Sequence, residues 1–141
     1  MIKRILLSTF LLLNLFTFAQ NQVVNLGFEN YDALGSDDEE PTGWSSFRNA
    51  GGGLSGFVNN QKIEQTTDTR PGSSGMYSTR IWATSVFGTT ANGTMTTGQI
   101  QAGGFSAADP ANHNKTILSN PDFNQTFTGL PDSLVVWIKT N

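Results

Sequence analysis

Apolar and polar positions alternate along this chain in short runs, and each run is typical of a β-strand rather than a helix. The runs cover residues 23–28, 44–47, 54–58, 62–65, 76–87, 94–100 and 134–138. No window repeats apolar residues at positions i, i+3, i+4 and i+7 over the length of a helix. The pattern therefore predicts an all-β protein built from short strands.

Turn-forming residues between the runs indicate how the strands connect. Asn92-Gly93 separates residues 76–87 from residues 94–100, and this dipeptide is a strong hairpin signal, so the two runs are predicted to pair antiparallel. Residues 103–124 read as an irregular segment that covers a sheet edge or borders a site. A jelly roll of two packed sheets needs about eight strands. We expect a jelly-roll-like β-sandwich that is incomplete because the chain is a fragment.

The N-terminus has the three parts of a secretory signal peptide. A basic start with Lys3 and Arg4 precedes the apolar residues 5–18, and Thr17 and Ala19 place small residues before a cleavage point. The apolar part is shorter than the ~20 residues that span a bilayer. The sequence predicts a leader over 1–19 and a mature part over 20–141 without a transmembrane segment after signal removal. We expect the mature part to be secreted or at the cell surface, and the periplasm is the alternative.

Composition narrows the chemistry further. The chain has no cysteine, which excludes disulfide scaffolds, zinc-thiolate sites and cysteine nucleophiles. Its formal net charge is -3, and Lys3 and Arg4 lie in the predicted leader, so the mature part is more acidic still. This charge argues against nucleic acid as a partner.

Several short motifs occur in an order that resembles a known family. They are residues 25–29 (NLGFE), 41–44 (PTGW), 78–81 (STRI), 96–98 (TTG) and 127–134 (FTGLPDSL). Together they resemble the N-terminal half of the carbohydrate metabolism domain of Bacteroidota secreted and cell-surface proteins, and the first two resemble the opening of carbohydrate-binding jelly rolls. Leu130 replaces the arginine of that family's last motif. The resemblance implies a β-sandwich that binds or processes glycans.

Four side chains fit a polysaccharide-binding platform. Sugar rings stack on flat apolar faces bordered by hydrogen-bonding groups. Trp82 and Trp137 lie mid-strand, opposite the more regular apolar row, with Arg80 beside the first and Lys139 beside the second. We expect both indoles on one outer face if the strands share a sheet. Core packing of this second face is the alternative, and core packing is also the interpretation for Trp44.

Acidic residues near the first predicted strand suggest a structural Ca2+ site. Glu29 follows that strand and Asp32 follows closely, and oxygen ligands are what calcium prefers. The four consecutive acids at 37–40 are able to add ligands, with a solvated acidic loop as the alternative. Calcium is therefore the one cofactor that the sequence suggests.

Catalysis by this segment is not favoured. The predicted strand interiors hold almost no carboxylates, Glu64 being the chief exception, and no Gly-x-Ser-x-Gly nucleophile motif occurs. His113 lies in a polar segment and reads as an exposed spectator. The leading hypothesis is a non-catalytic polysaccharide-binding module. The alternatives are part of a glycoside hydrolase, and a structural or adhesive sandwich.

Overall fold

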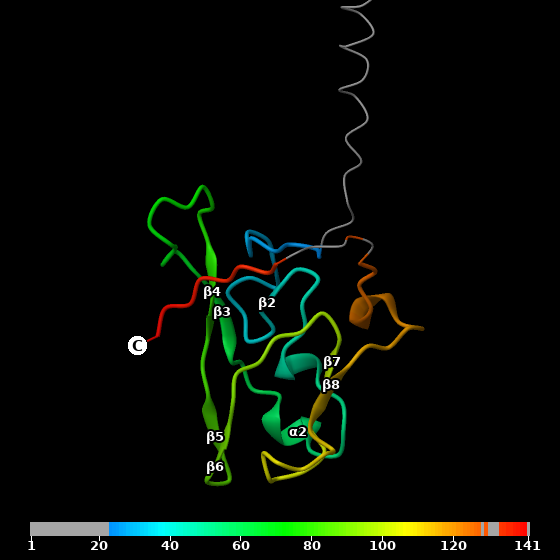
Figure 1. Ribbon diagram of the computed structural model, residues 1–141. Coiled ribbons are helices and arrows are strands. Elements are labelled where there is room, and N and C mark those ends of the chain that lie inside the picture. The colour runs from blue at the N-terminus through cyan, green and yellow to red at the C-terminus, as the bar shows by residue number, and fades with distance from the viewer. Residues whose placement is uncertain (1–22, 128, 130–132, 141) are drawn as a thin grey trace, which may run out of the picture.

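The computed structural model describes residues 23–127, 129 and 133–140 (Figure 1). The predicted leader therefore lies outside the described residues, as do four positions of the motif at 127–134. The described part contains strands β1 (Tyr31–Asp32), β2 (Glu40–Pro41), β3 (Ile63–Thr66), β4 (Ser78–Ile81), β5 (Thr84–Val86), β6 (Thr89–Ala91), β7 (Gln99–Gln101) and β8 (His113–Lys115), helix α2 (Ser55–Val58), and 3-10 turns η1 (Phe47–Asn49) and η2 (Pro121–Phe123). The predominance of strands confirms the all-β class.

The strands pair in four separate antiparallel pairs, and the described residues contain no closed sandwich. β3 pairs with β4, β5 with β6, β1 with β2, and β7 with β8. In Figure 1 the β3–β4 and β5–β6 pairs follow one another as a narrow ribbon, with α2 and the β7–β8 pair beside its lower part. The ribbon and its neighbours enclose the core.

The core is small and partly polar. Ile63, Ile100 and Ala102 are its buried apolar residues, and Lys62 is buried beside them. A sequence rich in small and turn-forming residues supplies few large apolar side chains, so hydrogen-bonded polar groups fill part of the interior.

The predicted hairpin at Asn92-Gly93 is wrong. The turn lies instead at Phe87 and Gly88, where φ is 50° and 78°, and this two-residue turn joins β5 to β6. Both positions have the positive φ that tight hairpins require. Gly93 is needed for another reason: a Cβ there would overlap the Ile81 side chain and the Trp82 backbone oxygen.

Two further strand predictions, for residues 23–28 and 54–58, are wrong. In both segments local hydrogen bonds stabilise a turn or a helix in spite of the alternation of apolar and polar residues. Residues 23–28 form a turn in which Asn25 and Phe28 have positive φ, and the Asn25 amide donates to the Asn30 carbonyl at 2.8 Å. Residues 54–58 include α2, which follows a glycine-rich turn. The preference of asparagine and glycine for turns accounts for both cases.

Three of the remaining runs are confirmed at least in part, whereas residues 44–47 form no strand: Ser45 makes an isolated bridge to Thr96, and η1 begins at Phe47. Residues 62–65 correspond closely to β3. Residues 76–87 divide into β4 and β5 at Trp82, and residues 94–100 lead into β7, which pairs with β8 inside the segment expected to be irregular. Residues 134–138 are exposed and have no strand partner in the described structure.

Candidate functional site

A groove of about 800 Å³ lies beside β4, and we call it the side groove. One wall is the upper part of the β3–β4 pair with the loop that joins these strands, and the other is the extended segment 134–139. Its lining includes Tyr77, Arg80, Trp137 and Lys139. Segments far apart in the sequence therefore form one concave surface.

Trp137 is the most open ring of the side groove. Its residue is 71% exposed, and the Arg70 guanidinium lies 5.1 Å from the ring centroid. A guanidinium over an indole face is attracted by the ring quadrupole and restricts how the ring turns. The high exposure shows that much of the ring surface is still free to contact a ligand.

Two ion pairs border the side groove. Arg80 lies directly opposite Glu64 in the β3–β4 register, and its Nη1 is 2.7 Å from the Glu64 carboxylate. Lys139 Nζ is 2.5 Å from the Asp68 carboxylate, which ties the 134–139 segment to the β3–β4 loop. Both pairs are solvent-exposed, so they orient side chains more than they stabilise the fold.

The inner end of the side groove is aromatic. Trp44 contacts Phe28 with ring centroids 5.4 Å apart, and its indole N–H donates to the Val24 carbonyl at 3.0 Å. Both rings line the groove. Trp44 is half-buried. It therefore packs against Phe28 and also lines the side groove.

Tyr31 links β1 to β4, the strand whose residues line the side groove. Its hydroxyl forms hydrogen bonds of 2.6 Å with the Thr79 hydroxyl and 3.2 Å with the Ser78 carbonyl. Burial raises the pKa of the Tyr31 phenol above its ordinary value. The phenol therefore remains a neutral hydrogen-bonding group that holds β1 against β4.

The four predicted ligand-binding residues are not all brought together. Trp137, Arg80 and Lys139 line the side groove, whereas Trp82 does not. Trp82 is half-buried at the break between β4 and β5, its N–H donates to the Lys62 carbonyl at 3.1 Å, and Arg80 lies 5.4 Å from its ring centroid. The two indoles therefore do not share the groove, and Trp82 lies outside both strands, between the end of β4 and the start of β5.

The residues predicted to bind calcium face different partners. Glu29 accepts hydrogen bonds from the backbone of Met76 at 3.0 Å and Tyr77 at 3.5 Å, which fixes the start of β4. Asp32 accepts from the Thr42 hydroxyl at 2.8 Å. Within residues 23–127, 129 and 133–140, no three carboxylate or imidazole side chains cluster as a metal site would require. The calcium site stays a prediction.

The acidic run at 37–40 is not simply a solvated loop. Asp37 and Asp38 are exposed, but Glu39 and Glu40 are 5% and 7% exposed. Glu39 accepts from the Gly35 N–H at 2.8 Å, and Glu40 accepts from the Ser46 N–H at 2.7 Å. The loop folds back so that its last two carboxylates accept hydrogen bonds from backbone N–H groups, of which that of Ser46 is buried.

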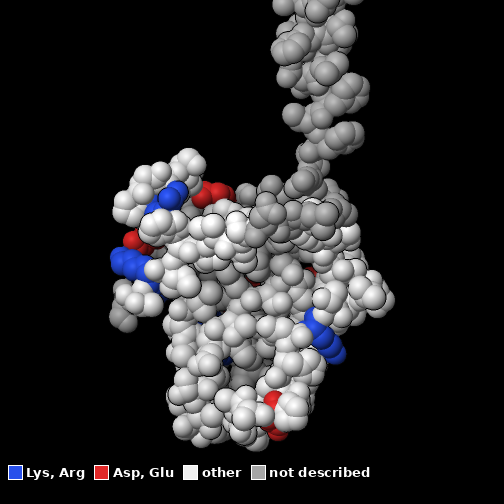
Figure 2. Space-filling view, viewed as in Figure 1, with Lys and Arg blue, Asp and Glu red and all other residues white. Residues whose placement is uncertain are grey.

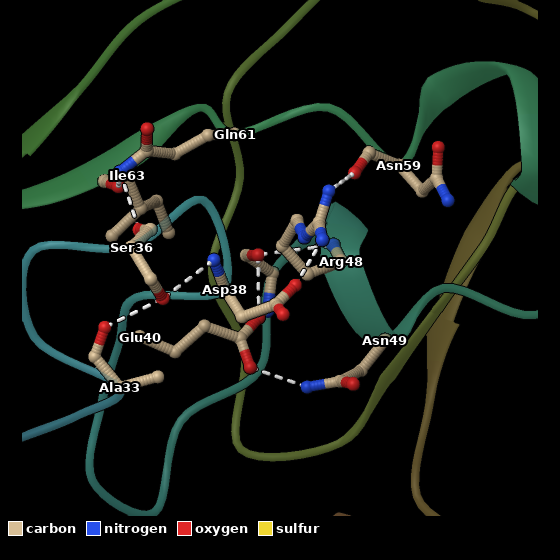
Figure 3. Close-up of polar contacts among 10 residues, drawn as sticks. Ala33, Ser36, Asp38, Glu40, Arg48, Asn49, Asn59, Gln61 and Ile63 are labelled. Carbon is tan, nitrogen blue, oxygen red and sulfur yellow. Dashed lines mark hydrogen bonds and ion pairs between the residues drawn. The ribbon is translucent and has the colours of Figure 1, made fainter.

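Glu40 connects β2 to η1, as Figure 3 shows. Its carboxylate also accepts from the Asn49 amide, while Arg48 contacts Asp38 and donates to the Asn59 carbonyl at 2.5 Å. Burial raises the pKa of Glu40, and the hydrogen bonds from Ser46 offset part of this shift. The network holds η1 in place, and with it the ring of Phe47.

Lys62 is a buried basic residue of the interior, in addition to the buried acids Glu39 and Glu40. It is 1% exposed, its ammonium donates to the Val58 carbonyl at 2.5 Å, and it lies 4.7 Å from the Phe47 ring centroid. Burial, and then the nearby Arg48 guanidinium, lower the pKa of Lys62 to about 8. The lysine thus satisfies carbonyls at the end of α2 at the cost of a desolvated ammonium.

Sequence reasoning missed Arg70 and Asp68 as groove residues. Both lie in the β3–β4 loop, next to Pro71-Gly72. This dipeptide predicts a turn but does not predict a binding role. Local signals identify such a loop but not what it faces. Their partners are Trp137 and Lys139, about seventy residues away along the chain.

The comparisons with known proteins add no relative. No protein-family model, curated protein or solved structure matches the chain. Among the described residues, no helix has the length and apolar character needed to cross a bilayer. The similarity to the carbohydrate metabolism domain therefore rests on the short motifs alone and stays a prediction.

Proposed function

We propose that this protein binds polysaccharide in the side groove, with Trp137 as the stacking platform and without catalysing a reaction. The observation that carries the proposal is the open indole of Trp137 in a groove that also contains Arg80 and Lys139. An exposed ring bordered by hydrogen-bond donors suits the apolar face and the hydroxyl edge of a sugar.

The charges of the side groove favour an acidic polysaccharide. Arg70, Arg80 and Lys139 line it together with one acid, Asp68, although the whole chain is acidic. Figure 2 shows basic atoms gathered with acidic ones at the left edge of a mostly uncharged face. Arg70 forms no ion pair with the described residues, so its guanidinium is available to a sugar carboxylate.

The proposal extends to three predictions from the sequence. The chain is exported by the leader at 1–19, it belongs to the carbohydrate metabolism domain family, and its strand pairs are part of a jelly-roll-like sandwich. The antiparallel pairing of every described strand supports the last point. Sequencing the N-terminus of protein recovered from the medium or cell surface tests export, since a start near Gln20 is expected.

Affinity electrophoresis against polygalacturonate and a neutral β-glucan tests the binding. We expect retardation by polygalacturonate, and we expect Trp137→Ala to weaken it about tenfold through loss of stacking. Trp82→Ala is the matched control, because Trp82 lies outside the side groove, and its retardation should equal that of the parent protein. No retardation by either polymer, or equal binding by both variants, contradicts the proposal.

A further inference from the structure

A second hollow is lined by residues of α2, the β5–β6 pair and the β7–β8 pair, elements that lie in the lower part of Figure 1. We call it the aromatic pocket. Its volume is about 320 Å³, and its apolar walls include Phe47, Phe57, Val86, Ile100 and Phe105. It shares no lining residue with the side groove, so it is a separate site.

Three phenyl rings form a row at this pocket. Phe57 and Phe87 have centroids 5.4 Å apart, and Phe87 and Phe105 have centroids 6.4 Å apart, both in edge-to-face arrangements. All three are more than half exposed. Phe87 also adopts a φ of 50°, a conformation that non-glycine residues seldom take. A left-handed turn residue thus carries a large apolar side chain toward solvent beside the pocket.

The rim of the pocket is polar and partly fixed. The Asn112 amide accepts from the Gly103 N–H at 2.9 Å and donates to the Ser106 carbonyl at 2.7 Å, which holds this part of the wall in shape. Thr89, Thr90 and Asn114 also line the pocket, and their side chains make no hydrogen bond with the described part of the chain. Their hydroxyl and amide groups are available to a ligand.

The lining contains no lysine, arginine, aspartate or glutamate, and His113 is its one titratable residue within the described part of the chain. A pocket with apolar walls and neutral polar groups gives nothing to offset the desolvation of a charged ligand. The ligand class that fits is therefore neutral, with an apolar body and one or two hydrogen-bonding groups.

The size of the pocket sets the size of the ligand. An engineered apolar cavity of about 150 Å³ accommodates one benzene molecule. The aromatic pocket has about twice that volume, 320 Å³. We propose that it binds a neutral bicyclic aromatic compound of the size of indole, stacked against the phenyl rings, with its polar atom toward the threonine and asparagine rim.

Indole is the direct probe, and calorimetric titration of the full chain gives its affinity. Ala107→Trp is the blocking variant, because Ala107 is exposed, lines the pocket and would place an indole of its own there. The matched control is Ser119→Trp, at an exposed position outside the lining. We expect the parent and Ser119→Trp to bind indole equally and Ala107→Trp to bind it about tenfold more weakly or not at all.

Two further measurements keep the proposal open to refutation. Phe105→Ala removes one wall and should weaken indole binding severalfold even if Ala107→Trp misfolds. Indole-3-acetate, which adds a carboxylate, should bind more weakly than indole. Absence of indole binding, binding unchanged by both pocket variants, or equal binding of indole-3-acetate overturns the proposal. Trp137→Ala should leave indole binding unchanged, so failure here is distinct from failure of polysaccharide binding.

Discussion

The side groove and the aromatic pocket both present aromatic rings to a ligand, but they differ in the charge of the polar groups beside those rings. The groove combines an open indole with ion-paired arginine and lysine side chains, whereas the pocket combines phenyl rings with threonine and asparagine. Both are largely apolar surfaces, so apolar area alone does not distinguish them. The comparison teaches that the charge at the border of an aromatic surface decides which class of ligand it suits.

Gly93 packs against the residues at the break between β4, which lines the side groove, and β5, which lines the aromatic pocket. A Cβ at Gly93 would overlap the Ile81 side chain and the Trp82 backbone oxygen. We expect Gly93→Ala to lower the free energy of unfolding by about 3 kcal/mol, because backbone must move to admit the methyl group. Urea denaturation measures this.

Gly53→Ala is the matched control for that experiment. No atom lies within 4 Å of the position a Cβ would take at Gly53. Its free energy of unfolding should stay within about 0.5 kcal/mol of the parent. If Gly93→Ala is as stable as Gly53→Ala, Gly93 does not pack against Ile81 and Trp82 as described.

Glu40 supports the pocket side of the molecule through η1. We expect Glu40→Ala to destabilise the protein by about 2 kcal/mol, because the buried Ser46 N–H loses its acceptor. Glu40→Gln keeps an acceptor and removes the charge, so it should be close to neutral in stability. Denaturation of both variants at neutral pH distinguishes hydrogen bonding from charge, and equal losses would contradict this role.

Lys62 makes the free energy of unfolding depend on pH. Its folded pKa of about 8 lies below the ordinary 10.5, so the unfolded chain binds more protons between these values and stability rises with pH across them. We expect a gain of about 1 kcal/mol between pH 8 and pH 9.5. Lys62→Met should flatten this slope, and a parent protein whose stability falls over the interval would contradict the assignment.

The smallest effect concerns salt. Raising ionic strength from about 0.02 M to about 0.3 M should weaken polygalacturonate binding about threefold, because charges at an exposed groove are screened. Indole binding in the aromatic pocket should not change, since no charged side chain lines it. Titrations at the two salt concentrations measure both. Equal salt dependence for the two ligands would remove the contrast between the regions.

The sequence predicted the class of structure better than its connections. Residues 62–65 are predicted as a short hairpin strand that follows the glycine-rich turn at 51–53, and they correspond closely to β3. The hairpin was misplaced by several residues, since Asn92-Gly93 and Phe87-Gly88 both permit a turn and the packing of Gly93 decides between them. Long-range contacts of this kind leave no local signal.

The candidate site was predicted in the same partial way. Trp137, Arg80 and Lys139 were recognised from strand alternation, and all three line the side groove. Trp82 fits the same alternation, but β4 ends at Ile81, and Trp82 does not line the side groove. The aromatic pocket was missed because Phe57 lies on α2, Phe105 on a loop and Phe87, beside the lining, on a turn, so that no single periodicity relates them.

A crossed titration of the full chain tests the account most directly. Trp137→Ala and Ala107→Trp are each titrated with polygalacturonate and with indole. We expect Trp137→Ala to lose affinity for the polymer alone and Ala107→Trp to lose affinity for indole alone. Loss of both ligands in either variant, or of neither ligand in both, would contradict two independent sites.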